Sequence, residues 1–283
     1  EGQNCTEFEE KFCGRFGWKY AVCTSSGTTA GEVLWAAIRE LHNVRATEPD
    51  ETPRVVTPAC AFISTANVLL TAGIMPHFVD VSLDTLNLAP AKINWNGIPN
   101  LAGVQFVATM GRGTPINQIA RDAVLASKKN KVYVISDSCE AHGAYIYKRK
   151  KVKGALTPQD RDSLPYLADH FADAVIYSFY VAHLIVGGEG GIIVTDNPDI
   201  QMLCQSIKSH GRPPQSTYFD FQRPATNAKW NDLMAAVALG SLEDFDKTFA
   251  ARKRIQAMLL TGLANVGEII LYSDRNEVSA PHG

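Results

Sequence analysis

Short, continuously apolar segments recur along the chain and alternate with stretches whose apolar residues repeat at helical spacing. The apolar segments predict strands at 20–24, 55–58, 78–81, 104–108, 132–135, 144–147, 175–177 and 192–194. The helical spacing predicts helices at 7–14, 29–41, 62–72, 117–128 and 200–209, and a long amphipathic helix after residue 231. Because strands and helices alternate, we predict an α/β fold with a mostly parallel sheet of about seven strands and helices on both faces.

Two of the expected helices carry capping signals at their starts. Thr6, followed three residues later by Glu9, has the pattern of a capping box for helix 7–14. Asn231 precedes the long helix, where an asparagine side chain can accept a hydrogen bond from a free N–H group of the first turn.

Composition narrows the class of protein. A chain of 283 residues with 46% hydrophobic residues is long enough for one large or two modest domains with a sizeable core. A formal net charge of −2 gives no reason to expect a nucleic acid or an anionic membrane as partner. The six cysteines are scattered without a CxxC pair, so we predict no metal site and no disulfide framework, and expect a cytoplasmic protein.

The stretch Tyr177–Gly191, YSFYVAHLIVGGEGG, carries the most distinctive chemistry. Ser178 stands at the end of an expected strand, and a single histidine, His183, follows before four glycines that surround Glu189. A serine at a strand end can donate to a phosphate, and a glycine-rich return lets the backbone approach a ligand closely. Taken alone, these residues favour the simpler interpretation, a strand–loop–strand hairpin with a satisfied histidine.

Other polar residues stand at the ends of expected strands. Ser26, Gly27 and Thr28 follow the first strand and begin a helix, whose N-terminal N–H groups and dipole favour anions, although an ordinary helix cap explains them too. Asp137 follows strand 132–135, where open α/β sheets place their ligands; a capping or ion-pairing aspartate is the alternative. Phe62 stands at a strand–helix junction, where a core phenylalanine is also common.

Taken in order, these motifs resemble the DegT/StrS family of pyridoxal-phosphate (PLP) sugar aminotransferases, from about Phe8 to the end of the chain. The resemblance implies the fold type I large domain over 1–245, with 246–283 as the start of a C-terminal small domain that is largely absent. It also implies a homodimer with shared active sites. The cofactor contacts that it implies are the phosphate at Ser26, Gly27, Thr28 and Ser178, the ring face at Phe62, the pyridine nitrogen at Asp137, the ring hydroxyl at Glu140, and Asn227 reaching from the other subunit.

The most informative departure from the family pattern is His183, which stands where the family has the lysine that binds the cofactor covalently. Within the family this exchange is typical of sugar 3-dehydratases, so the resemblance implies that His183 is the catalytic base. The expected cofactor is PLP or pyridoxamine phosphate (PMP), with a nucleotide-linked 4-keto sugar and glutamate as substrates. Two alternatives stay open: an aminotransferase that uses Lys208 or Lys229, and an inactive PLP-binding homologue. The basic run 148–153 is expected to be a solvated hairpin tip, and 154–172 a surface insertion.

Overall fold

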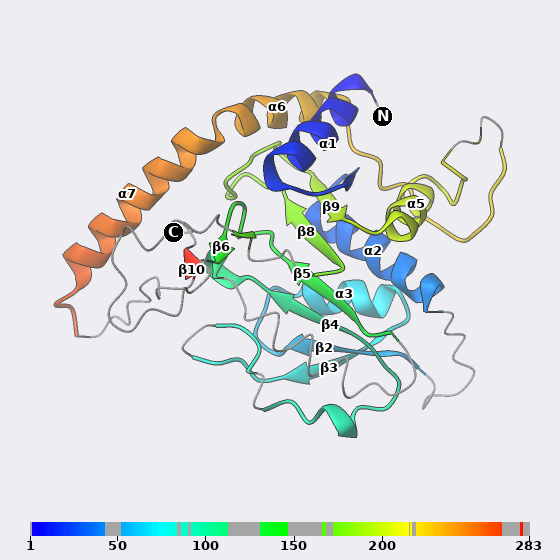
Figure 1. The fold of residues 1–283 in the computed structure, drawn as a ribbon, viewed down its shortest axis with the longest axis horizontal. Helices are drawn as coiled ribbons and strands as arrows, with labels where there is room; N and C mark the ends of the chain where they lie inside the picture. The colour runs from blue at the N-terminus through cyan, green and yellow to red at the C-terminus, as the bar shows by residue number, and fades with distance from the viewer. Residues whose placement is uncertain are drawn as a thin grey trace.

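A mixed seven-stranded sheet forms the centre of the protein in the computed structural model, which describes residues 2–42, 52–83, 86–89, 92–112, 131–146, 166–167, 172–214, 216, 219–267 and 278–279 (Figure 1). The strands of this sheet are β1 (Tyr20–Thr24), β2 (Arg54–Pro58), β3 (Met75–Val79), β4 (Leu101–Val107), β5 (Tyr133–Asp137), β8 (Ala174–Ser178) and β9 (Gly191–Thr195). A second, three-stranded sheet joins β6 (Tyr145–Ile146), β7 (Tyr166–Leu167) and β10 (Val278–Ser279).

The strand order of the large sheet is β1-β9-β8-β5-β4-β2-β3. Strands β8, β5, β4, β2 and β3 run parallel to one another, whereas β9 pairs antiparallel with both β8 and β1. The β8–β9 register brings Ser178 opposite Gly191, and the β1–β9 register brings Thr24 opposite the same glycine. The predicted mostly parallel sheet is therefore confirmed, and the segment around residue 183 connects two antiparallel strands.

Helices cover both faces of this sheet (Figure 1). They are α1 (Gln3–Phe16), α2 (Gly27–Leu41), α3 (Ser64–Thr71), α5 (Pro198–Ile207), α6 (Asp232–Glu243) and α7 (Phe245–Leu263), with short 3-10 turns at Trp95–Gly97 and Thr109–Gly111. In the described part of the chain, no helix has the length and apolar character needed to cross a membrane.

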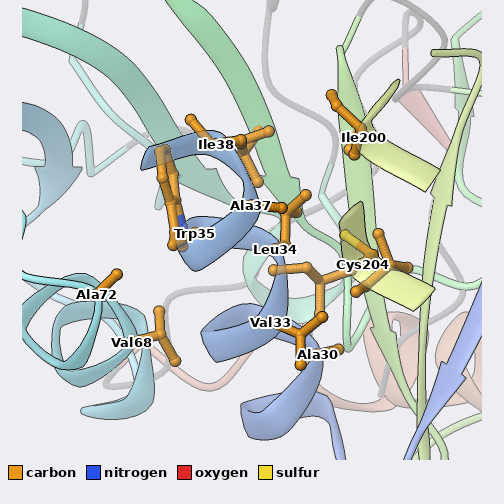
Figure 2. Packing of buried hydrophobic residues seen from close by; sticks show 14 of the residues in the cluster. Ala30, Val33, Leu34, Trp35, Ala37, Ile38, Val68, Ala72, Ile200 and Cys204 are labelled. Atoms are coloured by element: carbon orange, nitrogen blue, oxygen red, sulfur yellow. The ribbon is translucent and has the colours of Figure 1, made fainter. Parts of the chain in front are cut away.

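Helix α2 is the centre of the core on one face, as Figure 2 shows. Its buried residues Leu34, Trp35 and Ile38 pack between α3 and α5 and against the sheet. The Trp35 ring also makes a buried hydrogen bond, because its Nε1–H donates to Gln105 Oε1 of β4 at 2.6 Å. This packing fixes the position of the first turn of α2 relative to the strands.

Alternation along β8 and β9 divides their side chains between the two faces. Ile176 and Ile193 belong to the core on the α2 side, whereas Tyr177 and Ile192 belong to the core under α1 and α6. On this second face, Phe8 packs edge-on against both Phe179 and Trp230, with ring centroids 4.9 and 5.3 Å apart. The segment that follows β8 is thus anchored by aromatic packing before it leaves the sheet.

One capping prediction is wrong and the other is confirmed. Helix α1 begins at Gln3 with Gly2 as its N-cap, and Glu9 accepts a hydrogen bond from the Cys23 N–H at 2.6 Å instead of closing a capping box with Thr6. Asn231 does cap α6, because its Oδ1 accepts from the Leu233 N–H at 2.9 Å. The predicted helix at 117–128, the basic run 148–153 and nearly all of 154–172 lie outside the described residues.

Candidate active site

A cavity of about 620 Å³ opens at the carboxyl ends of β4, β5 and β8, next to the N-terminus of α2. We call it the strand-end cavity. It receives side chains from the first turn of α2, the segment before α3, the ends of three strands, and residues 179–190, which we call the central loop. Of the nine site residues predicted from the sequence, eight line this cavity: Ser26, Gly27, Thr28, Phe62, Asp137, Glu140, Ser178 and His183. Its volume is in the range of small-molecule and cofactor sites.

The first turn of α2 presents backbone donors to the cavity. Ser26 is the N-cap: its Oγ accepts from the Thr29 N–H at 3.1 Å, and the Thr29 hydroxyl accepts from the Ser26 N–H at 2.9 Å. The N–H groups of Gly27 and Thr28 come before this bond and have no acceptor within the helix. Together with the positive end of the helix dipole they form a place suited to an anion such as a phosphate.

Close approach of backbone segments completes this corner of the cavity. A Cβ at Gly27 would lie 2.7 Å from Ser178 Cβ and 3.1 Å from Cys139 Sγ, so a side chain there would collide with β8. A Cβ at Gly191 would lie 2.3 Å from the carbonyl oxygen of Ser26. Both glycines are needed because α2, β8 and β9 meet without room for a side chain. The Ser178 hydroxyl is thereby held beside the free N–H groups of α2.

Asp137 stands at the carboxyl end of β5 and faces the cavity. Its carboxylate accepts from the Cys139 N–H at 3.3 Å and from the Thr65 hydroxyl at 3.4 Å, both long hydrogen bonds. Burial raises the pKa of this carboxyl, and these hydrogen bonds oppose the rise only in part. Among the described residues no cation pairs with Asp137, so the ion-pair alternative has no support. A cationic ligand group would find a carboxylate ready to receive it.

Phe62 and Glu140 lie at the edges of the cavity. The Phe62 side chain is 75% exposed, so the alternative of a core phenylalanine is wrong, and its ring is available to cover a ligand. One oxygen of Glu140 accepts from the Met110 N–H at 2.5 Å, in a turn where Met110 has a φ of +52°. Glu140 thus supports a left-handed backbone turn and still lines the cavity.

His183 enters the cavity from the central loop, together with its neighbours Tyr180 and Ala182. Its N–H donates to the Tyr180 carbonyl at 2.9 Å, and the two rings meet nearly edge-on with centroids 5.9 Å apart. The buried His142 ring lies behind it, at a centroid distance of 6.0 Å. The loop returns to β9 through Gly188 and Gly190, whose φ angles of +82° and +149° suit glycine. The arrangement directs an imidazole into a cavity whose described lining contains no lysine or arginine.

Three residues named from the sequence do not line this cavity. Asn227 is exposed and forms an isolated bridge with Ser209, and Lys229 follows it two positions later. Lys208 is 4% exposed; its Nζ donates to the Cys23 carbonyl at 3.1 Å and lies 3.5 Å from Glu9 Oε1. Because its amino group is committed to linking α5 with α1 and β1, Lys208 does not reach a ligand in the strand-end cavity.

Replacing Lys208 by methionine tests this assignment. Lys208→Met is expected to lower the free energy of unfolding by about 1–3 kcal/mol, because the Glu9 carboxylate and the Cys23 carbonyl lose a buried cation. Ligand binding in the cavity is expected to stay unchanged. Urea unfolding measures the first effect, with Lys247→Met as control, since Lys247 is exposed on α7. An unfolding midpoint equal to that of the wild type would contradict the structural role.

Several cavity residues were not predicted from the sequence. Thr65 and Cys139 contact Asp137, and Gln105 lines the cavity while its Oε1 accepts a hydrogen bond from Trp35. A signal for Gln105 was present, because it is a polar residue within the otherwise apolar strand LAGVQFV. Cys139 follows Asp137 by two positions. For Thr65 only the fold reveals the contact, since 72 residues separate it from Asp137.

The sequence of the chain matches one family model and several curated proteins. A sequence model described as the DegT/DnrJ/EryC1/StrS aminotransferase family matches residues 1–282. The chain is 27% identical to a dTDP-4-dehydro-2,6-dideoxy-D-glucose 3-dehydratase of Saccharopolyspora spinosa, over 99% of this chain and 60% of that protein. It is 28% identical to the GDP-perosamine synthase of Caulobacter vibrioides, over 99% of this chain and 65% of that protein.

Solved structures share the fold. The E. coli GDP-4-keto-6-deoxy-D-mannose-3-dehydratase with bound hydrated PLP superposes with a TM-score of 0.78 at 20% identity, covering 99% of this chain and 70% of that one. The chain spans between 60% and 65% of the length of the curated relatives it matches.

Proposed function

The chain belongs to the DegT/DnrJ/EryC1/StrS aminotransferase family, and from that premise we propose that it is a PLP/PMP-dependent nucleotide-sugar 3-dehydratase. The observation that carries the proposal is the strand-end cavity, to which the central loop contributes His183 and whose described lining contains no lysine. Histidine cannot hold the cofactor covalently in a stable form, but it titrates near neutral pH and suits the work of a general base.

The cavity fits such a cofactor at its phosphate end. The tight packing at Gly27 and Gly191 leaves the backbone N–H groups of α2 and the Ser178 hydroxyl open to a phosphate. Asp137, whose pKa is raised by burial, has a carboxylate suited to a protonated pyridine nitrogen. Phe62 would cover the ring face and Glu140 would contact the ring hydroxyl, with Asn227 reaching in from a second subunit of a homodimer.

When bound, the cofactor supplies an amino group that condenses with a sugar ketone and a ring that accepts electrons. His183 would remove the proton from C4′ of the cofactor and would donate a proton to the C3 hydroxyl of the sugar, which leaves as water. Asp137 would keep the ring nitrogen protonated, which makes the ring a better electron acceptor. Tyr180 and Phe62 would exclude water from the reacting face.

The substrate class follows from what the reaction consumes. The sugar would need a ketone at C4 that can react with an amino group and a hydroxyl at C3 that can leave, and it would gain two electrons overall. Glutamate would supply these electrons, leaving as 2-oxoglutarate and ammonia. The names of the two curated relatives refer to dTDP- and GDP-linked sugars, which supports a nucleotide-linked hexose as substrate.

Incubation of the chain with PLP, glutamate and either a GDP- or a dTDP-linked 4-keto-6-deoxyhexose tests the proposal. A 3-deoxy sugar, formed together with one equivalent each of 2-oxoglutarate and ammonia, is the expected result. A stable 4-amino sugar without ammonia would overturn the proposal in favour of an aminotransferase. Neither product, despite cofactor binding, would favour an inactive homologue.

A further inference from the structure

Arg252 on α7 binds the backbone of the central loop at the residue assigned as the base. Its guanidinium donates from Nη1 and Nη2 to the Ala182 carbonyl, each at 3.3 Å, and from Nη2 to the His183 carbonyl at 2.9 Å. One side chain therefore holds two consecutive carbonyl groups. Hydrogen bonds from a charged donor are stronger than those between neutral groups, and a planar guanidinium fixes the direction of each.

The loop depends on such contacts because it has no regular structure of its own. Within it, the His183 N–H bonds to Tyr180 and the Gly187 N–H bonds to the Phe179 carbonyl, both at 2.9 Å. From outside, Ser241 of α6 accepts from the Val186 N–H at 2.9 Å. The carbonyls of Ala182 and His183 point the other way, towards α7. Arg252 thus adds a charged support on the carbonyl side of the histidine, beside the bond that the His183 N–H makes to Tyr180.

Helix α7 is placed firmly enough for its arginine to act as a fixed support. Phe245, Phe249 and Arg252 follow at intervals of four and three residues, so they share one face of the helix. Phe245 is buried, and a Cβ at Gly143 would lie 2.7 Å from its ring. Arg15 of α1 stacks over the same ring at 4.6 Å and forms an ion pair with Asp246 at 2.5 Å.

We propose that Arg252 is a positioning residue for His183, which holds the imidazole at the cavity without itself contacting substrate or cofactor. Arg252 is absent from the cavity lining, and its three bonds end on backbone oxygens. Without these hydrogen bonds, the backbone of Ala182 and His183 would be free to rotate, and the imidazole would turn away from C4′ of the cofactor. The role of His183 as base rests on the proposed function, whereas its placement by Arg252 can be measured without turnover.

NMR of the unliganded chain, labelled with ¹³C at the histidine rings, tests the proposal. The chain has seven histidines, and the His183 signal is identified by its loss in His183→Asn. In Arg252→Met, which keeps the apolar stem, the His183 signal is expected to shift and broaden, while the His77 and His210 signals stay in place. Exchange of the His183 amide hydrogen is expected to quicken about tenfold.

Arg254→Met is the matched control, because Arg254 is exposed on the same helix and carries the same charge. Arg254→Met is expected to leave the His183 signal and the amide exchange unchanged. Arg252→Lys is expected to bring both partly back to their wild-type values, because its single ammonium nitrogen can still donate to one of the two carbonyls. A wild-type His183 signal in Arg252→Met, or the same change in Arg254→Met, overturns the proposal. If Arg252→Met does not fold, Arg252→Gln is measured in its place. A wild-type His183 signal and wild-type amide exchange in Arg252→Gln would also overturn the proposal. If Arg252→Met changes the His183 signal as expected but His183→Asn keeps full dehydratase activity, the proposed function is refuted and the positioning role of Arg252 stands.

Discussion

His183→Asn is expected to keep PMP affinity and to lower the rate of sugar dehydration by about 10²–10⁴-fold. Asparagine is smaller than histidine but keeps a polar amide that can bond to its neighbours, and its amide nitrogen cannot accept the C4′ proton. PMP binding is measured by its absorbance change, and dehydration by the release of 2-oxoglutarate and ammonia. The dehydration rate should fall while the PMP affinity stays the same, because the side chain acts on the reacting proton and not on the cofactor's phosphate or ring.

His210→Asn is the matched control for this change. His210 lies outside the cavity with a φ of +63°, a backbone conformation that asparagine tolerates, so its replacement should leave the rate unchanged. His183→Lys should restore covalent cofactor binding, detected as pyridoxyl-lysine after borohydride reduction. Pyridoxyl-lysine in the wild-type chain, or full activity of His183→Asn, would refute the assignment of His183 as the base in place of the lysine.

Asp137→Asn is expected to slow turnover by about 10²–10³-fold and to weaken PMP binding by less. A neutral amide cannot hold the pyridine nitrogen protonated, so the ring loses much of its capacity to accept electrons, while phosphate and ring contacts remain. The ratio of the two effects is measured by titrating PMP and by following a single turnover with the 4-keto sugar. Equal losses in binding and turnover would show that Asp137 contributes only to affinity.

The same variant should have the opposite effect on the unliganded fold. Because burial raises the pKa of Asp137, its contribution to stability is fully present below the ordinary pKa of an aspartate and is lost as pH rises through the raised value. Asp137→Asn avoids this loss, so its Tm should exceed that of the wild type at pH 7–8, and the difference should shrink towards pH 4.

Saturating PMP should raise the Tm of the wild type more than that of Asp137→Asn, since only a carboxylate gains from a cationic ring. Asp220→Asn, a change of the same kind in an exposed loop, should alter neither Tm nor its response to PMP. A lower Tm of unliganded Asp137→Asn at pH 8 would mean that the carboxylate stabilises the empty cavity after all.

The sequence predicted the sheet and eight of the residues that line the strand-end cavity, because both depend on local patterns. Apolar runs of three to five residues marked β1, β8 and β9 within a residue or two, and small residues at strand ends marked Ser26 and Ser178. The failed capping box has a physical reason. Glu9 gains more from the Cys23 N–H and from Lys208 than from the backbone of its own helix, and α1 extends back to Gln3, where the Asp232 carboxylate accepts from the Cys5 N–H.

What the sequence could not show were contacts made across the fold. Lys208 looked available as a cofactor lysine, yet its partners on α1 and β1 are some 200 residues away in sequence, and no local pattern reveals them. Arg252 sits in a run of charged residues typical of an exposed helix face, and only the packing of α7 against residues 143 and 182–183 gives it a role. The predicted boundary between domains at 245 stays a prediction.

The antiparallel insertion of β9 between β1 and β8 has a consequence for how the protein is made. Thr24 pairs with Gly191, a partner synthesised about 170 residues later, so closing this pair carries a large entropic cost and is expected to be slow. On the ribosome, the first turn of α2 emerges early, but it meets β8 and the glycine return only after residue 195 has left the exit tunnel. Nascent chains halted before β9 should therefore expose the apolar edge of β1 and β8, where chaperones bind.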